Sequence, residues 1–175
     1  MRQVDMCQYR RMDAIKIRLA TPDDAHAVAG YHDRCIAHSY AAQVRAGELK
    51  APDIEGMERQ LGGWFEPGSG FVTHVADVDG EPIGHFTVYG HQLVHLFVEP
   101  NYQGIGLGRR LLELAEQMMV AEGHTQFELH TRVDNFAAIA FYKMAGWNMT
   151  DRVINTVELD ISYDEHVFVK QRSID

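Results

Sequence analysis

The chain has 175 residues with 46% hydrophobic and 23% charged side chains, and its net charge at pH 7 is −9. This length predicts a single domain, and no apolar run reaches the ~20 residues that a transmembrane helix needs. The surplus of acidic side chains argues against nucleic-acid binding, because proteins that bind nucleic acids contact the phosphates with basic side chains.

The N-terminal half of the chain predicts a strand, two helices and a hairpin. Residues 1–13 lack periodicity and are expected to form a loose tail before a single domain at 14–175. Thr21 and Pro22 carry the signals of a helix start, and Asp79 with Gly80 is typical of a tight hairpin turn. The expected elements are a strand at 15–20, a helix from 22 to about 45, a helix at 54–65, and strands at 71–78 and 81–90.

The C-terminal half predicts four more strands and two helices. These elements are a strand at 91–99, a helix at 106–123, a strand at 126–131, a helix at 134–145, and strands at 147–155 and 164–170. A strand, a helix and a strand in succession imply a right-handed crossover between parallel strands, whereas the earlier hairpin is antiparallel. The sequence therefore predicts an α/β (α+β) fold: a mixed, mostly antiparallel sheet of seven strands, flanked by about four helices.

A glycine-rich run, QGIGLG, separates the strand at 91–99 from the helix that follows it. The first amide groups of a helix have no partner within the helix and carry the positive end of its dipole, so this turn is a candidate anion site. The Rossmann pattern requires a glycine where Arg109 stands, and no Gly-Lys-Ser or Gly-Lys-Thr of a P-loop is present. A plain turn that starts a helix is the alternative.

A second motif, DNFAAIAFYKMAGW, begins with Asp134 as the expected N-cap. Asn135, Ala138 and Tyr142 are spaced three and four residues apart, so they lie along one side of the helix. An amide, a small residue and a phenol on one side of a helix can line a ligand site. A packed tyrosine with its hydroxyl at the surface is the other interpretation.

Taken together, the two motifs resemble the GNAT superfamily of N-acetyltransferases, with the match strongest from Val94 to Trp147. The resemblance implies acetyl-CoA as co-substrate, its pyrophosphate at the glycine-rich turn, and central parallel strands that splay apart to admit it. Tyr142 would then protonate the leaving thiolate. The residues that the resemblance places against the cofactor are Leu96, Phe97, Val98, Gln103, Gly104, Ile105, Gly106, Leu107, Gly108, Arg109, Asn135, Ala138 and Tyr142.

The implied reaction is direct attack of a neutral primary amine on the thioester within a ternary complex. Such an amine has to lose a proton, and members of the family often place a carboxylate or a histidine on the strand before the turn. No acid occupies residues 91–98. His95 is therefore the first candidate for the general base, and His91 or a water held by Gln92 are the alternatives.

The acceptor is expected to be a small-molecule amine or the amino group of a protein, bound between the first two helices and the last two strands. Nucleic acid and membrane are not expected as partners, and a homodimer is left open. A non-catalytic module that senses or scaffolds CoA is the alternative function, and a transferase of longer acyl groups is a third. The candidate acceptor residues are Tyr31, His32, His38, Tyr40, Trp64, Glu158, Asp160, Asp164 and Glu165.

The sequence predicts a cytoplasmic protein without a metal. No leader sequence opens the chain, and Cys7 and Cys35 have neither disulfide-framework nor zinc-site spacing. If the hairpin turn has two residues, His74 faces His85 across the strands, but such pairs occur far more often without a metal than with one.

Overall fold

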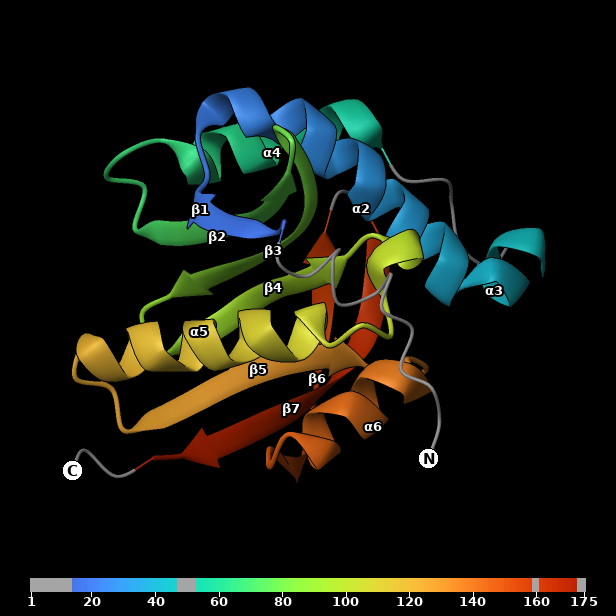
Figure 1. The fold of residues 1–175 in the computed structure, drawn as a ribbon. Helices are drawn as coiled ribbons and strands as arrows, with labels where there is room; N and C mark the ends of the chain where they lie inside the picture. The colour runs from blue at the N-terminus through green and yellow to red at the C-terminus, as the bar shows by residue number, and fades with distance from the viewer. Residues whose placement is uncertain (1–13, 47–52, 159–160, 173–175) are drawn as a thin grey trace, which may run out of the picture.

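The computed structural model describes residues 14–46, 53–158 and 161–172, which form a seven-stranded sheet with helices on both faces (Figure 1). The predicted fold class is confirmed, and the expectation for residues 1–13 lies outside the described residues. The strands are β1 (Lys16–Leu19), β2 (Phe71–Val78), β3 (Glu81–Tyr89), β4 (Gln92–Val98), β5 (Gln126–Arg132), β6 (Asn148–Glu158) and β7 (Ile161–Gln171). The helices are η1 (Pro22–Asp24), α2 (Ala25–Ser39), α3 (Ala41–Ala46), α4 (Ile54–Phe65), η2 (Pro100–Tyr102), α5 (Leu107–Ala121) and α6 (Phe136–Met144).

The strands lie in the order β1-β2-β3-β4-β5-β7-β6, and the pair β4–β5 is parallel while the other pairs are antiparallel. Pairing between β4 and β5 is short, since it joins only Gln92 to Glu128 and Leu93 to Leu129. Beyond Leu93 the two strands separate, as the resemblance implies. The sheet is therefore open at its centre, on the side where β4 runs into the glycine-rich turn.

A β-bulge in β4 lies where this separation begins. Val88 of β3 faces Leu93, but the preceding residue, Thr87, faces His95, so that Val94 is an extra residue in β4. An extra residue resets the alternation of side chains between the two faces of a sheet. After the bulge, His95 points toward α2 and α4, where its ring lies 4.9 Å from that of Trp64.

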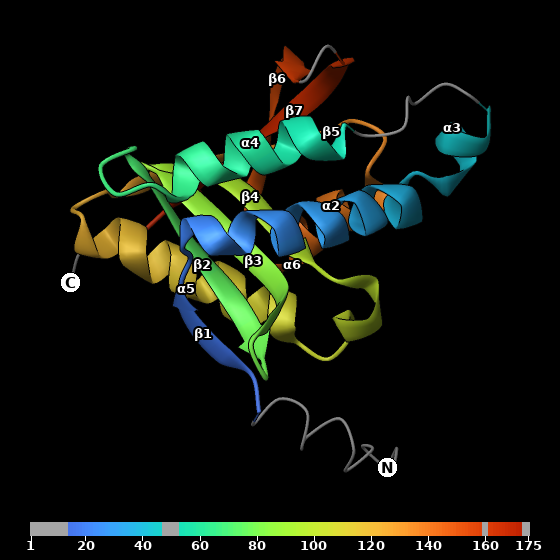
Figure 2. The same ribbon diagram turned by 90° about the horizontal axis from the view of Figure 1, so that it is seen from above.

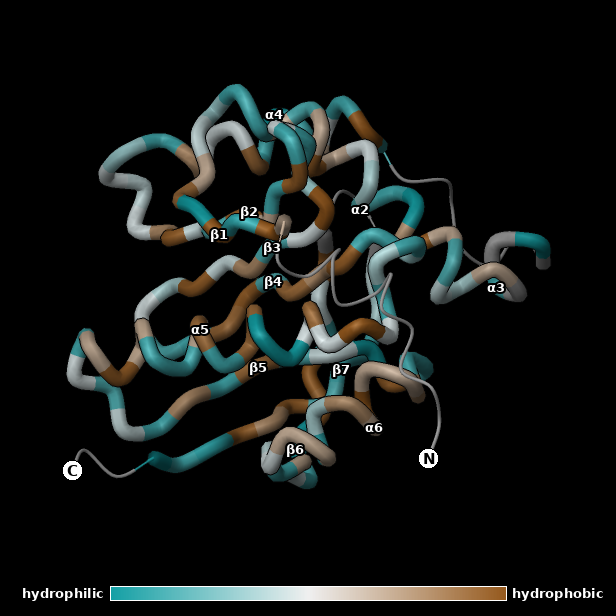
Figure 3. Tube along the Cα trace, viewed as in Figure 1, coloured by the Kyte–Doolittle hydropathy of each residue, from teal (hydrophilic) through white to brown (hydrophobic). Residues whose placement is uncertain are grey.

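Two hydrophobic clusters hold the helices on the two faces of the sheet (Figure 2). The helices α5 and α6 pack on one face through a cluster that includes Leu93, Leu111 and Phe127. The helices α2 and α4 cover the opposite face through a smaller cluster around Val28 and Leu61. Hydrophobic residues follow the central strands, as the brown segments of Figure 3 show. Because α5 and α6 lie on one face and α2 and α4 on the other, the open centre of the sheet lies between two layers of helices.

The helix predicted from 22 to about 45 is broken. It starts as a 3-10 turn, with Thr21 and Asp24 forming a capping box, and ends at Ser39 before the short α3. Tyr40 takes a non-helical conformation at the break, and its ring lies 4.6 Å from the guanidinium of Arg132. The break is thus associated with a contact to β5, which local helix signals do not contain.

The β2–β3 hairpin has the predicted turn but not the predicted pairing of histidines. Asp79 and Gly80 both have positive φ, as a tight two-residue turn requires. A bulge between Ala76 and Asp77 shifts the register, so that His74 faces Phe86 and its ring stacks on the phenyl ring at 5.3 Å. The prediction that His74 faces His85 is therefore wrong.

Glu116 of α5 ties this helix to the C-terminal part of the sheet. Its carboxylate is 1% exposed and accepts hydrogen bonds from Trp147 Nε1 (2.9 Å), Lys170 Nζ (2.7 and 2.9 Å) and Arg172 Nη2 (3.0 Å). A buried carboxylate is tolerated in a protein core only when its charge is matched in this way. One charged group therefore fixes α5, and with it the glycine-rich turn, against β7.

We expect Glu116→Gln to lower the free energy of unfolding by roughly 2 kcal/mol or more, because it removes the charge that compensates Lys170. The matched control is Glu113→Gln on the same helix, where the exposed ion pair with Arg109 is worth at most about 0.5 kcal/mol. Urea denaturation measures both. Equal losses in the two variants would show that the buried carboxylate does not anchor α5.

Candidate active site

A groove runs along the glycine-rich turn and has a volume of about 430 Å³. We call it the glycine-loop groove. It lies between the end of β4, the start of α5 and the helix α6. The residues that line it are Cys35, Ser39, Leu96, Phe97, Val98, Gln103, Gly104, Gly106, Gly108, Arg109, Asn135, Ala137, Ala138, Phe141 and Tyr142.

The backbone of the turn depends on its glycines and on one glutamine. Gly104 and Gly106 have φ values of 77° and 92°, which side-chain-bearing residues rarely adopt. Gly106 is also the N-cap of α5, so the unpaired amides of the first helical turn follow it directly. Gln103 holds the turn against the strand, because its Nε2 donates a hydrogen bond to the carbonyl oxygen of Val98 at 2.9 Å.

The groove differs from the predicted set of cofactor residues at six positions: Ile105 and Leu107 are missing from its lining, and Cys35, Ser39, Ala137 and Phe141 are additional. The side chains of Ile105 and Leu107 do not line it: they pack on the core beneath α5, and Leu107 is 1% exposed. Cys35, which lies outside both motifs, does line it. Burial raises the pKa of the Cys35 thiol to about 12, so this cysteine is protonated at neutral pH and is not a nucleophile.

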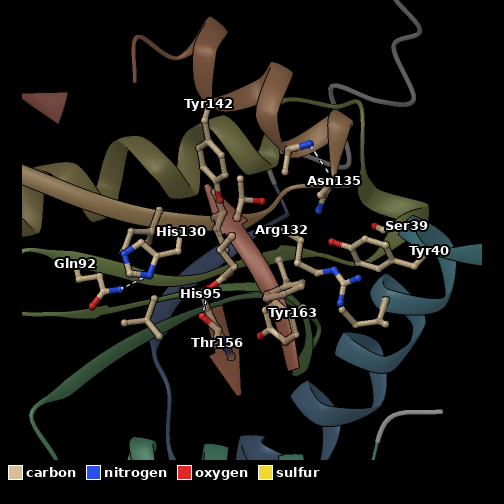
Figure 4. A pocket seen from close by; sticks show the side chains of 18 of the residues that line it. Ser39, Tyr40, Gln92, His95, His130, Arg132, Asn135, Tyr142, Thr156 and Tyr163 are labelled. Carbon is tan, nitrogen blue, oxygen red and sulfur yellow. Dashed lines mark hydrogen bonds between the residues drawn. The ribbon is translucent and has the colours of Figure 1, made fainter. Parts of the chain in front are cut away.

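A second hollow of about 380 Å³ opens on the other side of the separated strands (Figure 4). We call it the histidine cavity because His95 and His130 line it. Its walls come from α2, α4, β4, β5, α6 and the β6–β7 hairpin. Six of its lining residues also line the glycine-loop groove, namely Ser39, Leu96, Phe97, Asn135, Ala138 and Tyr142. The two hollows therefore meet at the gap between β4 and β5.

Tyr142 lies at this junction, and Figure 4 shows its ring descending from α6 into the cavity. The ring packs against Phe168 and Trp147, with centroids 6.0 and 6.4 Å away. Burial raises the pKa of the Tyr142 hydroxyl well above 10. The hydroxyl therefore keeps its proton at neutral pH and can donate it.

Asn135 rather than Asp134 caps α6, so the predicted N-cap is displaced by one residue. The Oδ1 of Asn135 accepts a hydrogen bond from the amide of Ala138 at 3.1 Å. Asp134 instead accepts two hydrogen bonds from Arg132, at 2.9 and 3.0 Å. Asn135, Ala138 and Tyr142 nevertheless lie together along the wall that both hollows share, as the spacing predicts.

The candidate bases separate into residues inside and outside the histidine cavity. His95 lines the cavity and is 8% exposed, and burial lowers its pKa to about 4. His91 lies apart, in a different hollow with His124. Gln92 lines the cavity, and its Nε2 lies 3.3 Å from Nδ1 of His130.

His130 is a cavity residue that the sequence analysis did not identify. Its Nε2 lies 2.8 Å from Glu128 Oε1, and Arg152 donates to the other oxygen of that carboxylate at 3.1 Å. Burial raises the pKa of Glu128, but the hydrogen bonds and charges of His130 and Arg152 outweigh this effect, and the net shift is downward. The alternation of Glu128, His130 and Arg132 along β5 is the signal that could have found it.

The proposed acceptor residues are only partly brought together. Tyr40, Trp64 and Glu165 line the histidine cavity. Tyr31 and His32 are buried beneath it, at 0% and 5% exposure, and His38 and Asp164 do not line it. The side chain of Glu158 and all of Asp160 lie outside the described residues.

The far wall of the cavity carries both charge and aromatic rings. The guanidinium of Arg132 lies between Tyr40 and Tyr163, 4.6 and 4.9 Å from the ring centroids. Glu165 accepts a hydrogen bond from the hydroxyl of Thr156 at 2.5 Å.

Within the described part of the chain, no three histidine, cysteine or acidic side chains are placed to hold a metal ion. Among the described helices, none is long and apolar enough to span a membrane.

Comparison with known proteins connects this site to one family. The model of the Acetyltransferase (GNAT) family matches residues 36–147. A mycothiol acetyltransferase of Streptomyces avermitilis is 30% identical over 152 residues, which are 82% of this chain and 46% of that protein. An acetyltransferase of Sodalis glossinidius is 33% identical over 141 residues, which are 80% of this chain and 92% of that protein. The chain spans less than half the length of the mycothiol acetyltransferases that it matches.

Solved structures show the same fold at lower sequence identity. A GCN5-related N-acetyltransferase from Rhodopseudomonas palustris has a TM-score of 0.73 and 19% identity, and the match covers 90% of this chain and 95% of that chain. An N-acetyltransferase from Thermoplasma acidophilum, solved in complex with coenzyme A, has a TM-score of 0.71 and 19% identity. That match covers 90% of this chain and 99% of that chain.

The buried histidines predict how stability depends on pH. The pKa values of His85 and His95 lie below 6.5 in the folded protein, that of His95 at about 4, so below pH 6.5 the unfolded chain takes up protons that the folded chain does not. Stability should therefore fall as the pH is lowered from 6.5 toward 4, by up to roughly 3 kcal/mol for His95 alone. Urea denaturation should show that the free energy of unfolding falls less between pH 6.5 and pH 4 in His95→Gln than in the unaltered protein. An identical fall in both proteins would contradict the lowered pKa of His95.

Proposed function

The chain belongs to the GNAT family of acetyltransferases, and we propose that it transfers the acetyl group of acetyl-CoA to a primary amine by direct attack in a ternary complex. The observation that carries this proposal is the meeting of the glycine-loop groove and the histidine cavity at Tyr142. Two substrates that enter from opposite sides of the sheet would have their reacting atoms side by side there. Such an arrangement lowers the entropic cost of bringing two reactants together.

The glycine-loop groove suits the extended, anionic body of coenzyme A. The pyrophosphate would lie at the N-terminus of α5, where unpaired amides and the helix dipole attract an anion and Gly104 and Gly106 let it approach the backbone. The pantetheine arm would follow β4 from Leu96 to Val98, where β4 has no pairing with β5. The Thermoplasma acidophilum N-acetyltransferase of similar fold was solved in complex with coenzyme A, which agrees with coenzyme A as the ligand.

The proposed chemistry needs no covalent enzyme intermediate. The nitrogen of the neutral amine forms a bond to the thioester carbon, the carbon–sulfur bond breaks, and the thiolate takes the phenolic proton of Tyr142. One amine proton leaves to a base in the histidine cavity. Proton exchange with solvent then restores both groups, so that the net products are an amide and a free thiol.

The acceptor is proposed to be a small-molecule amine or a protein amino group. The cavity volume of about 380 Å³ fits a small molecule or the end of a side chain. Glu165 and the ring of Trp64 suit a cationic amine as it enters, because carboxylates and ring faces both attract cations, whereas the rings of Tyr40 and Tyr163 already contact Arg132. Among the relatives, the names mycothiol acetyltransferase and peptidyl-lysine N-acetyltransferase cover both kinds of acceptor.

A CoA sensor or scaffold without turnover is the second candidate function. It would require the glycine-loop groove, but it would require neither the histidine cavity nor a protonated phenol at the junction of the two hollows. The continuity of the hollows at Tyr142 therefore favours the enzyme.

The cofactor assignment predicts the behaviour of Gly108→Leu. A Cβ at this position would lie 3.8 Å from Phe141 and from Val98, which are ordinary van der Waals distances. Both neighbours line the groove, so a larger side chain at this position extends into it. We expect calorimetry to show at least ~10-fold weaker CoA binding with no loss of melting temperature, because Leu is a better helix former than Gly. Gly63→Leu, with no atom within 4 Å of its Cβ, is the control. An unchanged dissociation constant would remove CoA from this groove.

The enzyme assignment predicts the behaviour of Tyr142→Phe. The change removes one oxygen and keeps the packed ring, so the melting temperature should change little. Loss of a positioned acid should lower kcat by ~10² or more with a much smaller change in the KM for acetyl-CoA. Tyr89→Phe, at an exposed position, controls for a general effect of the substitution. Full activity in the Tyr142 variant would leave this tyrosine as a packing residue.

A further inference from the structure

We propose that the two histidines of the histidine cavity are both held in the Nε2–H tautomer but offer opposite ring nitrogens to the acceptor, and therefore have opposite roles: Nδ1 of His130 accepts the proton of the attacking amine, and Nε2–H of His95 donates a hydrogen bond to an oxygen of the bound acceptor. The chemistry of this inference rests on the proposed acetyl transfer. The tautomers themselves are properties of the protein and can be measured without turnover.

The tautomer of His130 follows from its carboxylate partner. The lowered pKa of Glu128 keeps that side chain ionised, and an ionised carboxylate can only accept hydrogen bonds. The proton of His130 therefore lies on Nε2, 2.8 Å from Glu128 Oε1. The amide nitrogen of Gln92, which can only donate, lies 3.3 Å from Nδ1, in agreement with a lone pair on that nitrogen.

His85 and Tyr31 determine the tautomer of His95 from within the core. The Tyr31 hydroxyl is 0% exposed, and among the described residues its one hydrogen-bond partner is Nδ1 of His85, at 2.5 Å. Burial raises the pKa of Tyr31 well above 10 and lowers that of His85 well below 6.5, so the phenol keeps its proton and the imidazole is neutral. The phenol therefore donates to Nδ1, and the proton of His85 lies on Nε2.

The hydrogen-bond chain from Tyr31 through His85 extends to His95 in the cavity wall. Nε2 of His85 lies 3.4 Å from Nδ1 of His95, so Nε2–H of His85 donates and Nδ1 of His95 accepts. Neutral His95 then carries its own proton on Nε2. The opposite tautomer would leave the buried hydroxyl hydrogen of Tyr31 without an acceptor, which costs about 1–3 kcal/mol.

The two rings therefore differ in what they offer an incoming amine. Nδ1 of His130 has a lone pair, which the incoming amine takes over from Gln92, while Glu128 holds the ring through Nε2–H. His95 has no lone pair on Nε2, and its burial disfavours a positive charge because the ring is removed from water. Glu128, His85 and Tyr31 act as positioning residues, because each works through a histidine and none of them lines the cavity.

Long-range proton–nitrogen NMR correlation on the ¹⁵N-histidine-labelled protein tests the tautomers directly. We expect Nε2 to carry the proton in His95, His85 and His130. In Tyr31→Phe, the constraint on His85 is lost, and the signals of His85 and His95 should shift toward the Nδ1–H form while those of His130 stay unchanged. A proton on Nδ1 of His95 or of His130 in the unaltered protein would overturn the inference, whether or not the protein acetylates an amine.

Kinetics with an accepted amine test the roles. The side-chain amide nitrogen of Gln lies near the position of imidazole Nε2, and that of Asn lies near the position of Nδ1. We therefore expect His95→Gln to retain kcat/KM within about 10-fold, and His95→Asn to lower kcat/KM by ~10² or more. His130→Ala should lose a similar factor in kcat and recover activity on addition of imidazole. The roles would be refuted if His95→Gln lost as much activity as His95→Asn, or if imidazole restored activity to His95→Ala and not to His130→Ala.

Discussion

The structure depends on one interruption of strand pairing, the bulge at Val94 in β4. Backbone hydrogen bonds join β4 to β5 only as far as Leu93, and the bulge then turns β4 away from its parallel neighbour. Without this interruption the alternation of side chains would place His95 on the face of α5, within the apolar cluster, and the two strands would close the centre of the sheet. The glycine-loop groove and the histidine cavity both exist because the strands separate here.

The open centre exposes polar groups that the rest of the protein has to hold in place. Gln103 fixes the carbonyl of Val98 at the end of β4, and Glu116 fixes α5 against β7. On the cavity side, Glu128 holds His130, and Tyr31 with His85 holds His95. Most of these groups are partly or fully buried, where an unmatched hydrogen bond is costly, so their orientations are strongly determined. A site that orders two substrates benefits from such rigidity, because less has to be ordered on binding.

Local patterns in the sequence predicted the elements and the glycine-loop groove, because these depend on neighbours along the chain. The run from Gln103 to Gly108 contains its own turn glycines and helix start, and the spacing of Asn135, Ala138 and Tyr142 places them on one wall. Long-range contacts decided the rest. The break at Tyr40 accompanies its contact with Arg132, and the bulge that shifts His74 away from His85 was not visible in the hairpin sequence.

The role of each histidine was the least predictable feature from sequence. The sequence placed His95 on the right strand, but its pKa of about 4 and its hydrogen bond to His85 come from burial under α2 and α4. His130 is marked in the sequence only by the alternation of Glu128, His130 and Arg132 along β5, a pattern that any half-exposed strand can carry. Ile105 and Leu107 lie within the glycine-rich motif, but helical periodicity directs the side chain of Leu107 to the core.

The measurement that tests the central claim most directly is the initial-rate pattern of thiol release at varied acetyl-CoA and amine, with mass spectrometry of the product. Two substrates that meet at the gap between β4 and β5 should give intersecting double-reciprocal lines and an acetyl group on the amine nitrogen, with no acetylated protein. Parallel lines with an acetylated protein intermediate, or CoA binding without turnover across a broad panel of small amines and peptide amines, would contradict it.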